Sequence, residues 1–476
     1  MLHFGVVLRE GDYVVVGRDG LQVGFVGRHI SPEGLFGHLT TAMSLCSPEG
    51  VVVAFEHSAF LWVEPWAVIG LDSAEERVCR DAFEAGSKEL STDDFSPEFC
   101  SALSEGKFFR EEHDGNLSRS VYLHVTQRCN LNCVGCYSVN SKRNASPDLP
   151  LADIEVILTK LKGLNVDSLV ISGGEPFLRK DLPDIVSFAK TKGIRSVSVI
   201  TNGTSIKREI LQRLSGAVDR IAVSFDGSSS SSSESYIRGY QRFADLKKSI
   251  LAIEEEGINA HIIATIHAFN IQDIPSYFEL ARSLNVGINF GLLSCTADDK
   301  HSKRLIPDDN ALERLAEILI ENAGQNAFSC GFNLNGSISA RGWCGAGRTC
   351  LSVSHEGLLY PCHMLQFDGY TIANLLKDSL ADVEEKIDNS PFSTLDVESI
   401  SGCSNCGMKY LCGGGCRARS LYAYGDVRSC GPYCALAKNF MVCLAICLED
   451  SMRNRLIPTV NMSNYGHSLL VIVSNN

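Results

Sequence analysis

The stretch "SVYLHVTQRCNLNCVGC", residues 120–136, begins as a strand and ends in three closely spaced cysteines. Its first half is rich in β-branched and aromatic residues, which predicts a β-strand. That strand delivers Cys129, Cys133 and Cys136 into a loop with the spacing C-x3-C-x2-C. Structural zinc usually takes four ligands from paired cysteines, whereas three thiolates on one short loop suit a [4Fe–4S] cluster with one open iron. A zinc site completed by a residue such as His124 is the alternative.

Downstream of the cysteine triplet, apolar strands alternate with amphipathic helices at intervals of about 25–30 residues. Strands are expected within 120–126, 167–178, 196–203, 219–227, 259–266 and 286–293, and helices over 151–164, 182–193, 207–216, 240–257 and 271–285. One helix between successive strands predicts right-handed βαβ units and a parallel sheet. Six such units form a full or partial α/β barrel, whose functional residues belong at the carboxyl ends of the strands.

The barrel, expected over residues 116–330, is flanked by two further regions. Residues 1–115 read as β-hairpins followed by helices from about residue 71, which predicts an N-terminal α+β domain. Residues 331–453 are rich in cysteine, glycine and turns, which predicts a metal-organised domain with a closing helix at its end. Residues 454–476 are expected to form a tail. The serine run at 228–233 predicts a flexible loop at the barrel rim.

Composition narrows the class of protein. The chain has 476 residues, 45% hydrophobic and 21% charged, as in a globular protein. The net charge of −13 and the lack of a long basic run disfavour nucleic-acid binding. We find no secretory signal and no apolar run long enough for a membrane helix, so we expect a cytoplasmic protein without a membrane partner. Its nineteen cysteines then favour metal binding or redox chemistry over disulfides.

Four motifs in order resemble the radical S-adenosylmethionine (SAM) superfamily. The cysteine triplet follows the first barrel strand, "GGEP" (173–176) the second, "TNG" (201–203) the fourth and "SFDG" (224–227) the fifth. The resemblance implies that the triplet binds three irons of a [4Fe–4S] cluster while the amino and carboxylate groups of SAM chelate the fourth. It implies a SAM pocket formed by Gly173, Gly174, Glu175, Pro176, Thr201, Asn202, Ser224 and Arg238. The GGEP glycines are expected to let Glu175 and backbone carbonyls approach the SAM amino group. The sequence departs from the family at Gly135, where an aromatic residue is common.

The second group of cysteines resembles the SPASM domain, a C-terminal extension of radical SAM enzymes that holds two auxiliary [4Fe–4S] clusters. The interleaved pattern of that family implies two ligand sets: Cys344, Cys350, Cys362 and Cys416 for one cluster, and Cys403, Cys406, Cys412 and Cys434 for the other. Cys434 is preferred to Cys430 because "PYC" resembles the closing motif of the family. A zinc ribbon is the alternative. With two complete ligand sets, electron relay is favoured over substrate ligation.

SPASM proteins mostly modify ribosomally made peptides, which implies hydrogen abstraction from a peptide and a crosslink or similar product. The N-terminal domain is then expected to bind a leader peptide, and a flavodoxin or ferredoxin to donate the electron. His363 follows Cys362 where sulfatase-activating relatives carry Asp, which argues against that activity. His363 is a candidate proton acceptor, or else a hydrogen-bond donor beside the cluster. A small-molecule substrate and a non-enzymatic iron–sulfur or zinc scaffold are the alternatives.

Overall fold

The computed structural model describes residues 118–138, 143–225, 227–228, 243–294, 304–323, 343–404, 406 and 409–440. It also describes eight short strands between residues 5 and 71 and between 459 and 472. The chain forms two compact units. One comprises His113–Ile306 and Gly345–Leu395, and the other comprises Met1–Glu112, Pro307–Cys344 and Asp396–Asn476.

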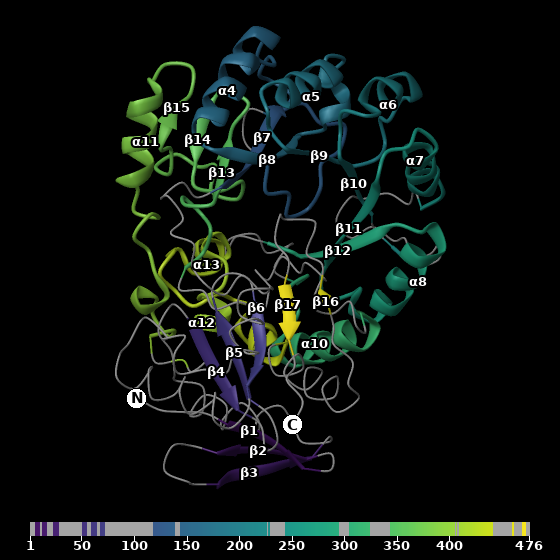
Figure 1. Ribbon diagram of the computed structural model, residues 1–476. Helices are drawn as coiled ribbons and strands as arrows, with labels where there is room; N and C mark the ends of the chain where they lie inside the picture. Colours follow the sequence, from purple (N-terminus) through teal and green to yellow (C-terminus); the bar gives the residue numbers. More distant parts are fainter. Residues whose placement is uncertain are drawn as a thin grey trace. The chain divides into compact units, whose positions relative to one another are not determined.

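The first unit contains a nine-stranded sheet in the order β12-β11-β10-β9-β8-β7-β13-β14-β15. Six neighbouring strands are parallel and follow chain order: β7 (Arg119–Thr126), β8 (Val166–Gly173), β9 (Ser196–Thr201), β10 (Arg220–Ser224), β11 (Ala260–Ile266) and β12 (Gly287–Leu292). The helices between them are α4 (Leu151–Gly163), α5 (Leu182–Thr191), α6 (Arg208–Leu214), α7 (Phe243–Glu255) and α8 (Ile274–Leu284). In Figure 1 these helices follow one another along the outer side of the curved sheet. The partial α/β barrel predicted from the sequence is therefore confirmed.

One expectation about the order of the motifs was wrong. TNG ends β9, the third barrel strand, and SFDG follows β10, the fourth. After β8 the chain passes through a single 3-10 turn, η2 (Pro176–Leu178), directly into α5, so there is no additional strand before β9. The motifs therefore follow four consecutive strands, β7 to β10, whose carboxyl ends lie side by side.

Residues 345–395 extend the barrel sheet instead of joining the C-terminal domain expected from residue 331. β13 (Cys350–Val353) pairs in parallel with β7, and β14 (Leu358–Tyr360) and β15 (Ala373–Asn374) continue the sheet in antiparallel fashion. The Arg119 Nε donates to the Arg348 carbonyl at 3.1 Å. β7 therefore has a partner on both sides and is central in the sheet. Helix α11 (Leu380–Asp388) follows, capped by Ser379 and Asp382.

The core of this unit lies between the strands and the helices that cover them. Alternate residues of neighbouring strands are fully buried, among them Val121, Leu123, Leu169, Ile171, Val197, Val199, Ile221 and Val223. They pack with apolar helix residues, such as Ile157 and Leu161 of α4 and Ile185 of α5, in one cluster. The period of two along the strands thus sets which side chains meet the helices. The core fixes the strands whose carboxyl ends carry the motifs.

The second unit contains an eight-stranded sheet in the order β16-β17-β6-β5-β4-β1-β2-β3. Its strands are β1 (Gly5–Arg9), β2 (Asp12–Val16), β3 (Gln22–Gly27), β4 (Gly50–Ala54), β5 (Ala59–Val63), β6 (Ala67–Leu71), β16 (Thr459–Val460) and β17 (Leu469–Ile472). The predicted hairpins are present as the antiparallel pairs β1–β2 and β2–β3. The expected tail instead contributes β17, which pairs in parallel with β6, as its apolar "LLVI" run allows.

The described residues of the second unit include the helices α10 (Asp309–Ala323), α12 (Lys409–Cys412) and α13 (Arg417–Tyr424), with a 3-10 turn η5 at Val397–Ser399. Residues 434–440 are helical, which agrees with the start of the predicted closing helix. The remainder of that helix, the helices expected after residue 71 and the serine run from residue 229 onward lie outside the described residues. No helix within the described ranges is long and apolar enough to cross a membrane.

Candidate active site

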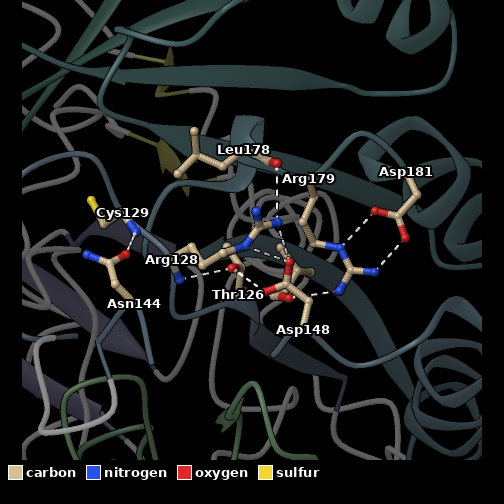
Figure 2. A network of polar contacts seen from close by, with 9 residues as sticks. Thr126, Arg128, Cys129, Asn144, Asp148, Leu178, Arg179 and Asp181 are labelled. Carbon is tan, nitrogen blue, oxygen red and sulfur yellow. Dashed lines mark hydrogen bonds and ion pairs between the residues drawn. The ribbon is translucent and has the colours of Figure 1, made fainter. Parts of the chain in front are cut away.

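The cysteine loop begins at the carboxyl end of β7 and is fastened there by a polar network (Figure 2). The Asp148 carboxylate accepts hydrogen bonds from the Thr126 hydroxyl and, at 3.0 Å, from the Arg128 Nε. The Asn144 side-chain oxygen accepts from the Cys129 N–H at 2.8 Å. Residues that follow the triplet in sequence therefore fold back and fix the backbone at its first cysteine.

A second arginine ties the same strand end to the GGEP segment. Arg179 is buried, and its guanidinium donates to the Val125 carbonyl at 2.9 Å and pairs with the Asp181 carboxylate (Figure 2). The Asp181 pKa is lowered by this hydrogen-bonded guanidinium. The Arg128 side chain also reaches the Leu178 carbonyl at 3.3 Å. The strand end, the loop and η2 are thus held together by charged hydrogen bonds, which are stronger than neutral ones.

The two GGEP glycines pack directly against the backbone of the cysteine loop. Gly174 donates its N–H to the Thr126 carbonyl at 2.8 Å, and Glu175 donates to the Arg128 carbonyl at 2.8 Å. A Cβ at Gly174 would lie 2.1 Å from the Arg128 oxygen, and one at Gly173, where φ is +127°, 2.4 Å from the Thr126 oxygen. Packing against the loop therefore accounts for both glycines, a reason different from the SAM contact expected from the sequence.

Glu175 joins the ends of three neighbouring segments. Its side chain is fully buried and accepts hydrogen bonds from the Thr201 hydroxyl and the Asn202 N–H, both at 2.7 Å, and from the Phe177 N–H at 3.0 Å. Burial raises the pKa of the Glu175 carboxyl, and these three donors act in the opposite direction. Pro176 follows at the start of η2. The carboxylate therefore holds the TNG turn against the GGEP turn.

Asn202 connects the TNG turn to the loop between the first two cysteines. Its side-chain nitrogen donates to the Asn130 oxygen at 2.9 Å and lies 4.0 Å from the Cys129 sulfur. Asn130 in turn donates to the Thr204 and Ser205 hydroxyls at 2.7 and 3.2 Å. The predicted site residues at the ends of β7, β8 and β9 are therefore brought together in one place.

The third cysteine of the triplet lies beside a cation. The Arg143 guanidinium is 3.4 Å from the Cys136 sulfur and donates to the Ser138 hydroxyl at 2.8 Å. The guanidinium is therefore placed to donate a hydrogen bond to the sulfur of a metal-binding thiolate at Cys136. Arg143 was not singled out in the sequence, because a basic residue in a polar loop carries no signal without the fold.

The departure at Gly135 has a local structural reason. Its φ is +66°, and a Cβ there would lie 2.9 Å from Leu293 Cδ1 and 3.0 Å from the Ser294 carbonyl oxygen. A larger residue would therefore collide with the segment that follows β12. Tyr137, two residues on, turns to β8, with its hydroxyl 3.1 Å from that of Ser172.

Ser224 and Arg238 are the two remaining residues of the predicted SAM pocket. Ser224 ends β10 beside the TNG strand, at the carboxyl edge that holds the other motifs. Phe225, the next residue, is fully buried, and Gly227 donates its N–H to the Tyr277 hydroxyl at 2.7 Å. Arg238 lies outside the described residues.

His363 is packed among aromatic rings. Its imidazole stacks on Tyr122 with centroids 4.1 Å apart, and Tyr137 approaches edge-on at 5.0 Å. His124 lies in the same cluster, 6.0 Å from the Tyr137 ring, and is fully buried. Burial, followed by nearby His363, lowers the pKa of His124 to about 3, so its ring is neutral at pH 7. His363, which follows Cys362, thus packs against Tyr137, which follows the cysteine triplet. This packing favours a role for His363 in positioning its neighbours.

The cysteines of the first auxiliary set are divided between the two units. The register that pairs Ser352 with Tyr360 brings Cys350 opposite Cys362, and the Gly347 N–H donates to the Cys350 and Pro361 carbonyls at 3.0 and 2.8 Å. These cysteines belong to the barrel unit, whereas Cys344 and Cys416 belong to the other.

The second auxiliary set lies entirely within one unit. Cys406 donates its N–H to the Cys403 carbonyl at 2.8 Å, Cys412 ends α12, and Cys434 begins the last described helical segment. Cys430, which the family pattern omits, contacts the thiols of both Cys403 and Cys434.

Cluster ligation requires cysteine thiols rather than disulfides. The cysteines in the described part of the chain form no disulfide bond. Nowhere among the described residues do three His, Cys, Asp or Glu side chains gather as the ligands of one metal ion. A zinc site holds its sulfurs and nitrogens about 2.0–2.3 Å from one ion. In a four-iron cluster each thiolate binds a different iron, so its sulfurs lie further apart.

Comparisons with known proteins agree with the fold and the motifs. Residues 123–281 match the Radical SAM superfamily. An AdoMet-dependent heme synthase of Methanosarcina barkeri is 26% identical over 344 residues, covering 67% of this chain and 97% of that protein. A PqqA peptide cyclase of Xanthomonas euvesicatoria is 25% identical over 327 residues, covering 66% of this chain and 87% of that protein.

Two solved structures share the fold. The structure of anSMEcpe with bound AdoMet has a TM-score of 0.59 at 16% identity, covering 71% of this chain and 99% of that one. Streptococcus suis SuiB bound to its precursor peptide SuiA has a TM-score of 0.54 at 17% identity, covering 82% of this chain and 99% of that one. The family match, the cysteine triplet and the motifs after β8, β9 and β10 together indicate a radical SAM domain in the barrel part of this chain.

Proposed function

We propose that this enzyme cleaves SAM reductively and abstracts a hydrogen atom from a ribosomally made peptide, installing a crosslink or a similar modification. The observation that carries the radical chemistry is the convergence of the triplet loop, the GGEP turn and the TNG turn through Glu175 and Asn202. A non-enzymatic scaffold has no use for these turns around a cluster loop.

The chain's own residues would prepare the site for SAM. Cys129, Cys133 and Cys136 would hold three irons of a [4Fe–4S] cluster, which when bound supplies the electron that cleaves SAM at low potential. Arg143 would stabilise the Cys136 thiolate, and Asn144 keeps the backbone at Cys129 in place. The Glu175 carboxylate is already satisfied by three donors, so we assign it the role of orienting the TNG turn.

The backbone groups that SAM would use are those of GGEP and TNG, together with the Ser224 and Asn202 side chains. Arg238 is proposed to meet the SAM carboxylate. The two auxiliary clusters would be held by Cys344, Cys350, Cys362 and Cys416, and by Cys403, Cys406 and Cys412 with a closing cysteine. Their role would be to relay an electron between the radical intermediate and a flavodoxin or ferredoxin.

A peptide substrate is favoured by the relatives and by the N-terminal sheet. One similar protein is named a PqqA peptide cyclase, and one similar fold was solved with a precursor peptide bound. Among the described strands, β3 is at one edge of the eight-stranded sheet and pairs only with β2. An edge strand offers unpaired N–H and C=O groups to which a leader peptide can add as a further strand.

A small-molecule substrate is the second candidate. It is favoured by the similarity to a heme synthase, which extends over 97% of that protein. The two candidates differ in what the β3 edge must do, because a small molecule has no need of strand addition.

The test uses a peptide encoded by a short open reading frame beside the gene, incubated anaerobically with reconstituted enzyme, SAM and a strong reductant. Mass spectrometry should show the loss of two hydrogen atoms from the peptide for a crosslink, together with 5′-deoxyadenosine. A peptide without its leader should remain unmodified. An unchanged full-length peptide, with 5′-deoxyadenosine formed only when a small molecule is added, would contradict the peptide proposal.

A matched pair of proline variants tests whether the peptide adds to the β3 edge of the sheet. Neighbouring residues of a strand direct their N–H groups to opposite sides, so one of Phe25→Pro and Val26→Pro removes an outward N–H of β3. That variant should lose peptide binding while it still forms 5′-deoxyadenosine. Peptide binding at parent strength by both variants would exclude β3 as the docking strand.

A further inference from the structure

Cys430 lies at the second auxiliary site, although the family pattern assigns it no role. Its thiol makes hydrogen-bonding contacts with both the Cys403 and the Cys434 thiols. The Cys430 thiol therefore contacts two cysteines assigned to this cluster, and the backbone N–H of a third, Cys406, donates to the Cys403 carbonyl at 2.8 Å.

The backbone holds Cys430 beside Cys403. The Ser401 N–H donates to the Arg428 carbonyl at 2.7 Å, and Ser401 forms a parallel bridge with Ser429. The register of this bridge places Cys430 next to Gly402, where a Cβ would be 3.6 Å from the Cys430 Cβ. The position of Cys430 thus follows from main-chain pairing.

Arg417 fixes the same segment from the other side. This arginine is almost fully buried, and its guanidinium donates to the Val427 and Ser429 carbonyls at 2.8 and 3.0 Å and to the Gly414 carbonyl. It therefore clamps the residues before Cys430 onto the glycine loop between Cys412 and Cys416. With the Gly415 carbonyl, which accepts from its Nε at 3.4 Å, the buried guanidinium has four carbonyl partners, and these make the arrangement rigid.

We propose that Cys430 and Cys434 are alternative ligands of one iron in the second auxiliary cluster, with one of them bound at a time. This rests on the proposed function, in which Cys403, Cys406 and Cys412 hold the other three irons. Two thiols in mutual contact can reach the same open iron. With the cluster bound, an exchange of the two sulfurs would transfer one proton from the incoming thiol to the departing thiolate, so it would conserve charge and need no oxidant or reductant. The unbound thiol donates a hydrogen bond to the bound thiolate.

The experiment measures iron and electron paramagnetic resonance in the full chain with Cys129, Cys133 and Cys136 replaced by alanine. This background leaves the two auxiliary clusters, or about eight irons per chain. Cys430→Ala and Cys434→Ala should each retain about eight irons, and the double variant should fall to about four. Each single variant should also lower the reduction potential of the second cluster, because a hydrogen bond to its sulfur is lost.

Cys406→Ala serves as the control and should fall to about four irons. If Cys434→Ala alone falls to about four while Cys430→Ala stays at eight, or the reverse, a single dedicated ligand closes the cluster and the exchange is refuted. If Cys406→Ala keeps about eight irons, the auxiliary ligand set of the proposed function is itself wrong. The two failures are therefore distinguishable.

Discussion

Replacing Gly174 by alanine tests whether the GGEP turn and the cysteine loop form one packed unit. The added Cβ would lie 2.1 Å from the Arg128 carbonyl oxygen and 2.7 Å from its carbon, so backbone must move. Overpacking of this kind costs about 1–3 kcal/mol. The movement also breaks the hydrogen bonds from Gly174 to Thr126 and from Glu175 to Arg128, at about 0.5–1.5 kcal/mol each. The expected loss of unfolding free energy is about 2–6 kcal/mol.

The assay is urea unfolding of the metal-free chain, followed by circular dichroism, with iron content measured after reconstitution. Gly216→Ala is the matched control, because Gly216 has a φ of +76° and no atom within 4 Å of its Cβ position. That control should cost only the backbone strain of about 1–2 kcal/mol and keep its iron. Equal losses in the two variants, with parent iron content in both, would refute the packing argument.

Three further variants probe the same site. Arg143→Ala removes the guanidinium beside the Cys136 sulfur and should lower the potential of the triplet cluster, by about 60 mV for each 1.4 kcal/mol of lost stabilisation, in a redox titration. Asp148→Asn weakens a half-exposed pair with Arg128 and should cost only about 1 kcal/mol in urea unfolding, while loss of iron would show a larger role for the pair. The pKa of His124 is about 3 in the fold against 6.5 unfolded, so its neutral form stabilises the protein above pH 6.5 and this stability is lost as the pH falls toward 3. At pH 4.5 the parent should have lost on the order of 3 kcal/mol through this residue. His124→Leu should show a flatter pH dependence, and an unchanged slope would contradict the buried neutral ring.

The barrel could be predicted from the sequence because the apolar residues of each strand and helix recur with the period of that element. The strand before the triplet and the helix at 151–164 were expected within about two residues of their bounds, as local pattern allows. The pairing of β13 with β7 could not be predicted, because four residues at Cys350–Val353 carry no signal for a partner 230 residues earlier. Division of the chain into units depends on such long-range pairing.

The candidate site shows the same difference between short sequence motifs and contacts of residues that are far apart in the sequence. The cysteines and motifs were found because their spacing is local in sequence. The sequence did not reveal that Glu175 is occupied by Thr201, Asn202 and Phe177, or that Arg143 lies at Cys136, since these contacts depend on the fold. The GGEP glycines were found for one reason and are explained by another, the close approach of the loop backbone.

The measurement that tests the central claim most directly is 5′-deoxyadenosine formation by anaerobically reconstituted enzyme with SAM and a strong reductant, beside Cys133→Ala. The account predicts 5′-deoxyadenosine from the parent and none from Cys133→Ala, with iron in the parent. Zinc in place of iron, or equal product from both proteins, would contradict the assignment of the triplet to SAM cleavage.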